Sequence, residues 1–129
     1  MVRLPRAIAD AMVAHARSEL PNESCGLLAL RAGELADFAP AENAEPSPYY
    51  YRIGPADALR VIDIEDAGDE VVIYHSHTMS PASPSRTDVE LAQSWPDALY
   101  VIVSLAGDEA QINAWKLVPA IEQVPLSIT

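Results

Sequence analysis

The sequence EVVIYHSH at residues 70–77 sets the architecture expected of this chain. Its apolar run, VVIY, consists of β-favouring residues and has the length of a strand, which predicts a strand buried on both faces. Because alternate side chains of a strand share a face, His75 and His77 are predicted to project together, with Cα atoms about 6.5 to 7 Å apart. Ser76 then points to the opposite face.

Predicted helices and strands alternate along the sequence, both before and after this strand. Apolar side chains recur about every four residues in the first helical segment, and Pro5 suits its first turn. The patterns predict helices over residues 5–20, 56–66 and 85–95, strands over 25–30, 35–38, 49–53, 99–105 and 110–118, loops over 39–48 and 78–84, a hairpin turn at 106–109 and an edge strand within 121–128. This alternation is typical of an α/β domain with a mixed sheet.

Length and composition are those of an ordinary globular protein. The 129 residues are expected to form one domain, residues 1–129, with a core of its own. Half of the residues are apolar and 21% are charged, which argues against disorder. The single cysteine, Cys25, excludes an internal disulfide and a zinc site made only of cysteines. It lies on a predicted buried strand and is expected to be a core residue or part of the wall of the site, rather than a nucleophile.

The net charge is strongly negative, because the chain has eight Arg and Lys residues and nineteen Asp and Glu residues, which gives −11. Such a surface repels phosphate groups, so nucleic acid and anionic membranes are not expected as partners. No apolar run approaches the ~18 residues of a membrane span and no signal-peptide pattern is found, so the expected location is cytoplasmic. The acidic run within residues 63–70 is interpreted as a solvated face.

The residues that follow the central strand complete a candidate zinc site. His75 and His77 are followed by Asp88, near the start of a predicted helix. Two imidazoles and one carboxylate are ligands that suit a catalytic zinc, which keeps its fourth position for water. The alternative at this point is two partly buried histidines that hydrogen-bond to the backbone.

A structural role is also open for Ser85 and Asp88. A serine followed three residues later by an acid is the pattern of a helix capping box. Thr87 and Glu90 offer the helix an equivalent box, so Ser85 and Asp88 are expected to be available for chemistry.

The complete pattern resembles the JAMM (MPN-plus) zinc metalloproteases. HSH at residues 75–77, seven residues, Ser85, two residues and Asp88 follow an upstream Glu23 in the context ESCGLL, which matches the family pattern without substitution. The resemblance covers about residues 5–118. It implies a curved mixed β-sheet flanked by helices, similar to the cytidine deaminase fold, and zinc-dependent cleavage of amide or isopeptide bonds.

The resemblance also implies a role for each residue of the pattern. His75, His77 and Asp88 become the ligands of one zinc ion, with water as the fourth ligand. Glu23 becomes the general base that takes the proton of the water and passes it to the leaving amine. Ser85 becomes a donor to the developing oxyanion. Without the resemblance, Glu23 is interpreted as a solvated acid between a helix and a strand.

The sequence is most similar in appearance to short bacterial members that act on ubiquitin-like sulfur-carrier proteins, and it is too compact for the insertions with which deubiquitinating members hold ubiquitin. This similarity implies a carrier ending in Gly-Gly as the partner. It favours release of cysteine from a carrier–cysteine adduct, with trimming of residues beyond the Gly-Gly and a general deubiquitinase-like isopeptidase activity as alternatives. The oligomeric state stays open.

Two functions of other classes are weighed against this one. A non-catalytic MPN scaffold is the first, but such scaffolds lose metal ligands and every ligand is present here. A hydrolytic zinc deaminase is the second, but it requires a PCxxC motif that one cysteine cannot supply.

Several other residues are expected to play ordinary parts. His15 is interpreted as a surface or capping histidine, and Tyr49 to Tyr51 as sheet packing or as the wall of a groove for an extended peptide. Met79 to Pro81 are expected to border the substrate channel.

Overall fold

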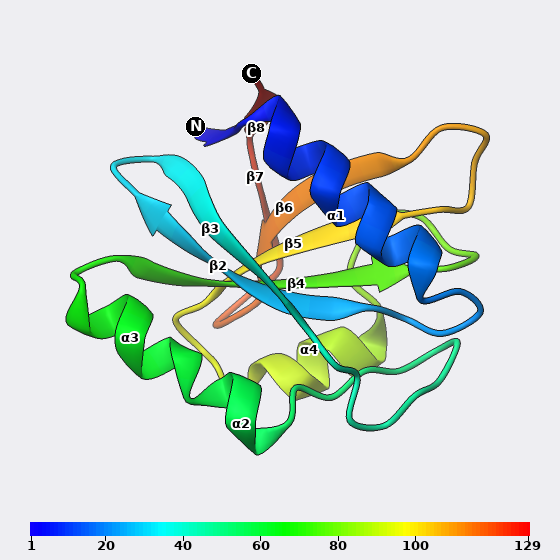
Figure 1. Cartoon of the computed structure of the whole chain (residues 1–129), viewed down its shortest axis with the longest axis horizontal. Helices are drawn as coiled ribbons and strands as arrows, with labels where there is room; N and C mark the ends of the chain where they lie inside the picture. The colour runs from blue at the N-terminus through cyan, green and yellow to red at the C-terminus, as the bar shows by residue number, and fades with distance from the viewer.

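The strand predicted at residues 70–77 is the centre of an eight-stranded sheet. The computed structural model describes residues 1–129 (Figure 1). β4 (Glu70–His77) pairs antiparallel with β2 (Cys25–Arg31) and parallel with β5 (Leu99–Ser104), which confirms a mixed sheet. The other elements are β1 (Val2–Leu4), α1 (Arg6–Ser18), β3 (Glu34–Ala41), α2 (Pro55–Ala58), α3 (Arg60–Asp66), α4 (Arg86–Ala92), β6 (Gln111–Lys116), β7 (Glu122–Val124) and β8 (Leu126–Ile128).

The sheet is curved, and its two edge strands are consecutive in the C-terminal segment of the chain. Its strand order is β7-β6-β5-β4-β2-β3-β1-β8. β7 pairs with β6 at one edge and β8 pairs with β1 at the other, although only Pro125 separates β7 from β8 along the chain. The carbonyl of Pro125 accepts a hydrogen bond of 2.9 Å from the backbone N–H of Val2. The single edge strand predicted within 121–128 is therefore two short strands, one on each edge.

Two hydrophobic cores form because the side chains of the central strands alternate between faces. Val72 and Tyr74 belong to the core beneath α1, whereas Ile73 belongs to the core beneath α3 and α4. Figure 1 shows α1 over one face of the sheet and α2, α3 and α4 against the other. The α/β architecture predicted from the sequence is confirmed, and the sheet is its middle layer.

The segment between β3 and α2 differs from the prediction. Residues 49–53 do not form a strand, because only an isolated bridge joins Ile53 to Asn43. β3 extends to Ala41, into the predicted loop, because its pairing with β2 continues as far as Cys25. The aromatic residues that suggested a strand are therefore on an irregular segment, residues 42–54, that crosses the end of the sheet.

The helices are shorter than the sequence patterns suggested. The helix predicted over 56–66 is divided into α2 and α3 at Leu59, and the helix predicted over 85–95 ends at Ala92. Pro5 is the N-cap residue of α1 rather than a residue of its first turn, and β1 before it carries too few residues to show a pattern. None of these helices is long and apolar enough to cross a membrane.

Candidate metal centre

The C-terminal end of β4 gathers the predicted site residues from separate elements. His75 and His77 lie there, buried, with ring centroids 5.1 Å apart. Asp88 reaches them from the first turn of α4, which begins at its N-cap residue Ser85. Glu23 lies just before β2, the strand that pairs with this end of β4. The structure thus brings together all five residues that the sequence singled out.

The three predicted ligands present nitrogen and oxygen atoms to one another. One such atom from each of His75, His77 and Asp88 lies within 4.8 Å of the others. His75 Nε2 is 3.2 Å from Asp88 Oδ1 without the alignment of a hydrogen bond, and both ring nitrogens of this buried imidazole have no hydrogen-bond partner. Buried polar atoms are rarely left unpaired. A metal ion held by the three side chains would satisfy Nε2.

His77 supports the same conclusion through its two ring nitrogens. Its Nδ1 lies 2.8 Å from the carbonyl oxygen of Pro81, which can only accept a proton. In the neutral ring, Nε2 then directs a lone pair at Asp88 Oδ2, 2.9 Å away. Two lone pairs at that distance require a cation between them, which is a second proton or a metal ion. The donor set therefore fits a metal site.

The electrostatics of the centre favour a bound cation. Burial lowers the pKa of His77, but hydrogen bonds to Asp88 and to the Pro81 carbonyl outweigh it and raise the pKa above its ordinary value. Burial raises the pKa of Asp88, but its contacts with His75 and His77 outweigh that effect and hold the pKa far below its ordinary range. Asp88 is therefore an anion beside two imidazoles.

Glu23 is a buried acid without a hydrogen-bond partner at Oε1. Glu23 is only 5% exposed, so its interpretation from the sequence as a solvated acid is wrong. Burial is the main cause that raises the pKa of Glu23 to about 8, with His77 opposing the shift and Asp88 adding to it. A carboxyl group whose pKa lies near neutrality is suited to both take up and release a proton.

Of the two capping boxes that the sequence offered, α4 uses the one formed by Ser85 and Asp88, and not the one of Thr87 and Glu90. Ser85 Oγ accepts a hydrogen bond of 3.1 Å from the backbone N–H of Asp88, and Asp88 Oδ2 accepts one of 2.9 Å from the backbone N–H of Ser85. Asp88 contacts the imidazoles at the same time. The cap therefore fixes the carboxylate, and the hydroxyl proton of Ser85 stays free to be donated.

An open pocket of about 360 Å³ gives access to the centre. Met79 and Ser80, which were expected to border the substrate channel, line this pocket, whereas Pro81 does not. Met79 is 70% exposed and Tyr49 is 73% exposed. The full lining is Glu23, Pro48, Tyr49, His77, Thr78, Met79, Ser80, Ser85 and Thr87.

Two residues beside the centre were missed by sequence reasoning. The ring of Tyr51 stacks on the ring of His75, and the side chain of Asn43 donates a hydrogen bond to the backbone carbonyl of Glu23. The tyrosine run had suggested only packing or a groove. No signal in one sequence pairs these residues, because the contacts depend on the irregular path of residues 42–54.

The remaining candidates play structural parts. Cys25 is a buried core residue, and burial raises the pKa of its thiol to about 12, which favours the protonated thiol over a thiolate. His15 is not a surface or capping residue. It is half-buried, and its Nδ1 lies 3.2 Å from the hydroxyl of Tyr74, on the face of the sheet away from the metal centre.

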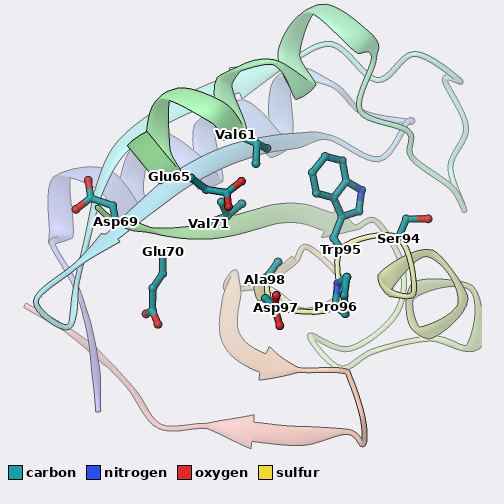
Figure 2. A pocket seen from close by; sticks show the side chains of 10 residues that line it. All are labelled: Val61, Glu65, Asp69, Glu70, Val71, Ser94, Trp95, Pro96, Asp97 and Ala98. Carbon is teal, nitrogen blue, oxygen red and sulfur yellow. The ribbon is translucent and has the colours of Figure 1, made fainter. Parts of the chain in front are cut away.

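A second hollow, of about 330 Å³, lies at the opposite end of β4 (Figure 2). It holds carboxylates but no histidine or cysteine, and its Asp69 is already paired with Arg31 at 2.7 Å. Glu65, Glu70 and Asp97 are exposed, which agrees with a solvated acidic face. The lining is Val61, Glu65, Asp69, Glu70, Val71, Ser94, Trp95, Pro96, Asp97 and Ala98.

Comparisons with known proteins agree with this geometry. The family model of prokaryotic homologues of the JAB domain matches residues 5–118. The CysO-cysteine peptidase of Mycobacterium tuberculosis is 42% identical over 127 residues, covering 94% of this chain and 86% of that protein. The probable TtuB-protein conjugate cleaving protease of Thermus thermophilus is 36% identical, covering 83% of this chain and 72% of that protein.

Solved structures share the fold over the whole chain. A Desulfitobacterium hafniense protein solved in solution has a TM-score of 0.84 at 29% identity, covering 100% of this chain and 93% of that one. A JAMM structure described as a metalloprotease-like zinc site in the proteasome and signalosome has a TM-score of 0.64 at 17% identity, covering 100% of this chain and 98% of that one. The peptidase class expected from the sequence is confirmed at the level of the family. The chain belongs to the prokaryotic JAB (JAMM/MPN) family.

Proposed function

We propose that this protein is a zinc-dependent peptidase that releases cysteine from the C-terminal Gly-Gly of a ubiquitin-like sulfur-carrier protein. The observation that carries the chemistry is one open pocket lined by the unpartnered acid Glu23, the imidazole His77 and the hydroxyl of Ser85. The class of substrate is supported by the relatives named for CysO-cysteine and for TtuB-protein conjugates. The proposal treats residues 1–129 as one catalytic domain.

Metal binding in this proposal uses the three side chains that meet at the end of β4. His75, His77 and Asp88 would hold one zinc ion per chain and leave its fourth position to water, as in catalytic zinc sites. When bound, zinc lowers the pKa of water to about 7 and polarises the carbonyl of the scissile bond. Asp88 is kept in place for this role by the capping box of α4.

Glu23 moves the proton in this proposal. Its carboxylate accepts a proton from the attacking water while the new C–O bond forms at the carbonyl carbon. It then gives that proton to the α-amine of the leaving cysteine as the C–N bond breaks. The products are the carrier with a C-terminal carboxylate and free cysteine.

Ser85 stabilises the charge that develops on the substrate carbonyl oxygen. Its Oγ accepts from a backbone N–H of its own helix, so the hydroxyl proton can be directed into the pocket. A hydroxyl aimed at such an oxygen lowers the barrier by about 3 kcal/mol.

The rim of the pocket fits an extended, apolar tail. Pro48, Tyr49, Thr78 and Met79 line the pocket and also a neighbouring hollow that includes Leu20 and Pro21, all uncharged. A Gly-Gly tail has no side chains and can bring its backbone close to the metal.

The cytoplasmic location expected from the sequence stays a prediction.

The direct test incubates zinc-loaded protein with a carrier–cysteine adduct and follows the mass of the carrier. Loss of the mass of one cysteine residue is expected, and Glu23→Gln is the matched control, in which the adduct should stay intact. Carriers extended by other residues test trimming, and an isopeptide-linked conjugate tests general isopeptidase activity. An adduct left intact by the zinc-loaded wild type would contradict the proposal.

A further inference from the structure

The two histidines of the centre are oriented in different ways. A histidine that binds metal usually donates its second ring nitrogen to a carboxylate, a carbonyl or water, which fixes the plane of the ring. His77 follows this rule through its Nδ1 and the carbonyl of Pro81. His75 does not, because its Nδ1 is buried and has no hydrogen-bond partner. Another contact must therefore fix the plane of the His75 ring.

Tyr51 makes the contact that can do this. Its ring centroid lies 4.5 Å from that of His75, and the two ring planes are inclined by only 15°. Tyr51 is 5% exposed and His75 is 0% exposed, so neither ring has free space in which to turn. A stacked neighbour restricts rotation about the bond that joins the imidazole to the chain, and so determines where Nε2 points.

The segment that carries Tyr51 also holds Glu23. Asn43, itself buried, donates from its side-chain amide to the carbonyls of Glu23, at 3.1 Å, and Tyr50, at 3.0 Å. Its side-chain oxygen accepts from the backbone N–H of Arg52 at 3.0 Å. The carbonyl of Ser47 accepts from the backbone N–H of Glu23 at 2.8 Å. Residues 42–54 therefore bind both backbone polar groups of Glu23 and place Tyr51 against His75.

We propose that Tyr51 is a positioning residue of the metal centre, which fixes the imidazole of His75 by stacking, and that Asn43 couples it to Glu23. The inference rests on the metal site of the proposed function but not on its substrate. Removal of the hydrogen-bonding partner of a metal-binding histidine lowers metal affinity about 10- to 100-fold. We expect a loss of at least the lower of these values when the ring stacked on His75 is removed.

The test measures zinc affinity by competition with a chromogenic chelator. Tyr51→Phe keeps the ring and is expected to bind zinc within about threefold of wild type, whereas Tyr51→Leu is expected to lose at least about tenfold. The visible absorption of the cobalt-substituted protein should change in Tyr51→Leu and not in Tyr51→Phe. Tyr51→Met fills the space without a ring and replaces Tyr51→Leu if the latter does not fold.

Tyr100→Leu is the matched control, because Tyr100 is a buried tyrosine of the same core that stacks on neither histidine. It should lose stability and keep its zinc affinity. Zinc affinity of Tyr51→Leu or Tyr51→Met within threefold of wild type, or an equal loss in Tyr100→Leu, would overturn the inference and leave the proposed function standing. A wild-type protein that binds no zinc would overturn both.

Discussion

The two ends of β4 differ in what surrounds their carboxylates. At the C-terminal end, Asp88 is buried against His75 and His77, and one of these rings has no hydrogen-bond partner for its nitrogens. At the N-terminal end, the carboxylates labelled in Figure 2 line an open hollow. Glu65, Glu70 and Asp97 are exposed, and Asp69 is paired with Arg31. The charge of a solvated or paired carboxylate is already stabilised by water or by its partner, so such a group gains little from binding a metal ion. A binding site is marked by burial and missing partners, and not by negative charge alone.

The comparison also explains how the chain tolerates its buried charges. The capping box of α4 and the imidazoles together stabilise the buried anion of Asp88, so the cost of removing it from water is offset by several charge-assisted hydrogen bonds. Glu23 has no such partners at Oε1, and its pKa rises instead. The same end of the strand thus holds one strongly ionised acid and one whose pKa lies close enough to neutrality for it to exchange a proton.

The largest effect is expected from Glu23→Gln, which separates catalysis from metal binding. The amide keeps the shape of the side chain but cannot take a proton, so turnover of the adduct should fall by about 10²- to 10⁴-fold. Zinc content should stay within twofold of wild type, since Glu23 is not a ligand. Single-turnover kinetics and elemental analysis of the same sample give both values. Full activity of Glu23→Gln would show that the assignment of the base is wrong.

Ser85→Ala should have the next largest effect, because it removes a donor and a helix cap together. We expect kcat to fall by about 10²- to 10³-fold and the free energy of unfolding to fall by about 1 kcal/mol. Ser85→Thr keeps a hydroxyl and should preserve most of both. Urea denaturation and steady-state kinetics distinguish the two contributions. An unchanged kcat in Ser85→Ala, with the expected loss of stability, would leave Ser85 as a cap only.

A smaller effect is expected in the pH dependence of the metal-free protein. Burial raises the pKa of Glu23 from 4.5 to about 8, so the folded state holds a proton that the unfolded state releases. This stabilisation is complete below pH 4.5 and is lost as the pH rises through 8. Relative to Glu23→Gln, the unfolding free energy of chelator-treated wild type should therefore decrease from pH 5 to pH 8. Parallel curves for the two proteins would contradict the burial of this acid.

The smallest effect is expected at the acidic hollow. The double variant Glu65→Gln, Asp97→Asn should keep its zinc content and turnover within twofold, and its unfolding free energy within about 0.5 kcal/mol. Elemental analysis, kinetics and denaturation test this on one preparation. A zinc content reduced by half would show that the hollow binds metal, and would contradict the conclusion that the two ends of β4 differ in this respect.

The sequence was informative where a residue pattern repeats or where spacing is fixed. The apolar run before His75 predicted the central strand, and the spacing from His75 to Asp88 predicted a centre that the structure assembles. Short strands that depend on tertiary pairing were missed or merged, because β1 was not predicted and β7 and β8 were predicted as one edge strand.

The contacts that orient the site could not be predicted. Asn43 and Tyr51 lie on a segment without regular structure, and a tyrosine in an aromatic run is more common in a sheet. The sequence did not decide which pair forms the capping box, because Ser85 and Thr87 both begin an equally good pattern. The choice is made by Asp88, which must point toward the histidines, and that requirement is visible only in three dimensions.

The most direct test of the central claim is the zinc content of the purified protein after reconstitution and removal of free metal. We predict one equivalent per chain in the wild type and almost none in Asp88→Ala, which lacks the carboxylate that faces both imidazoles. Less than about half an equivalent in the wild type, or an equal content in Asp88→Ala, would contradict a zinc centre built from His75, His77 and Asp88.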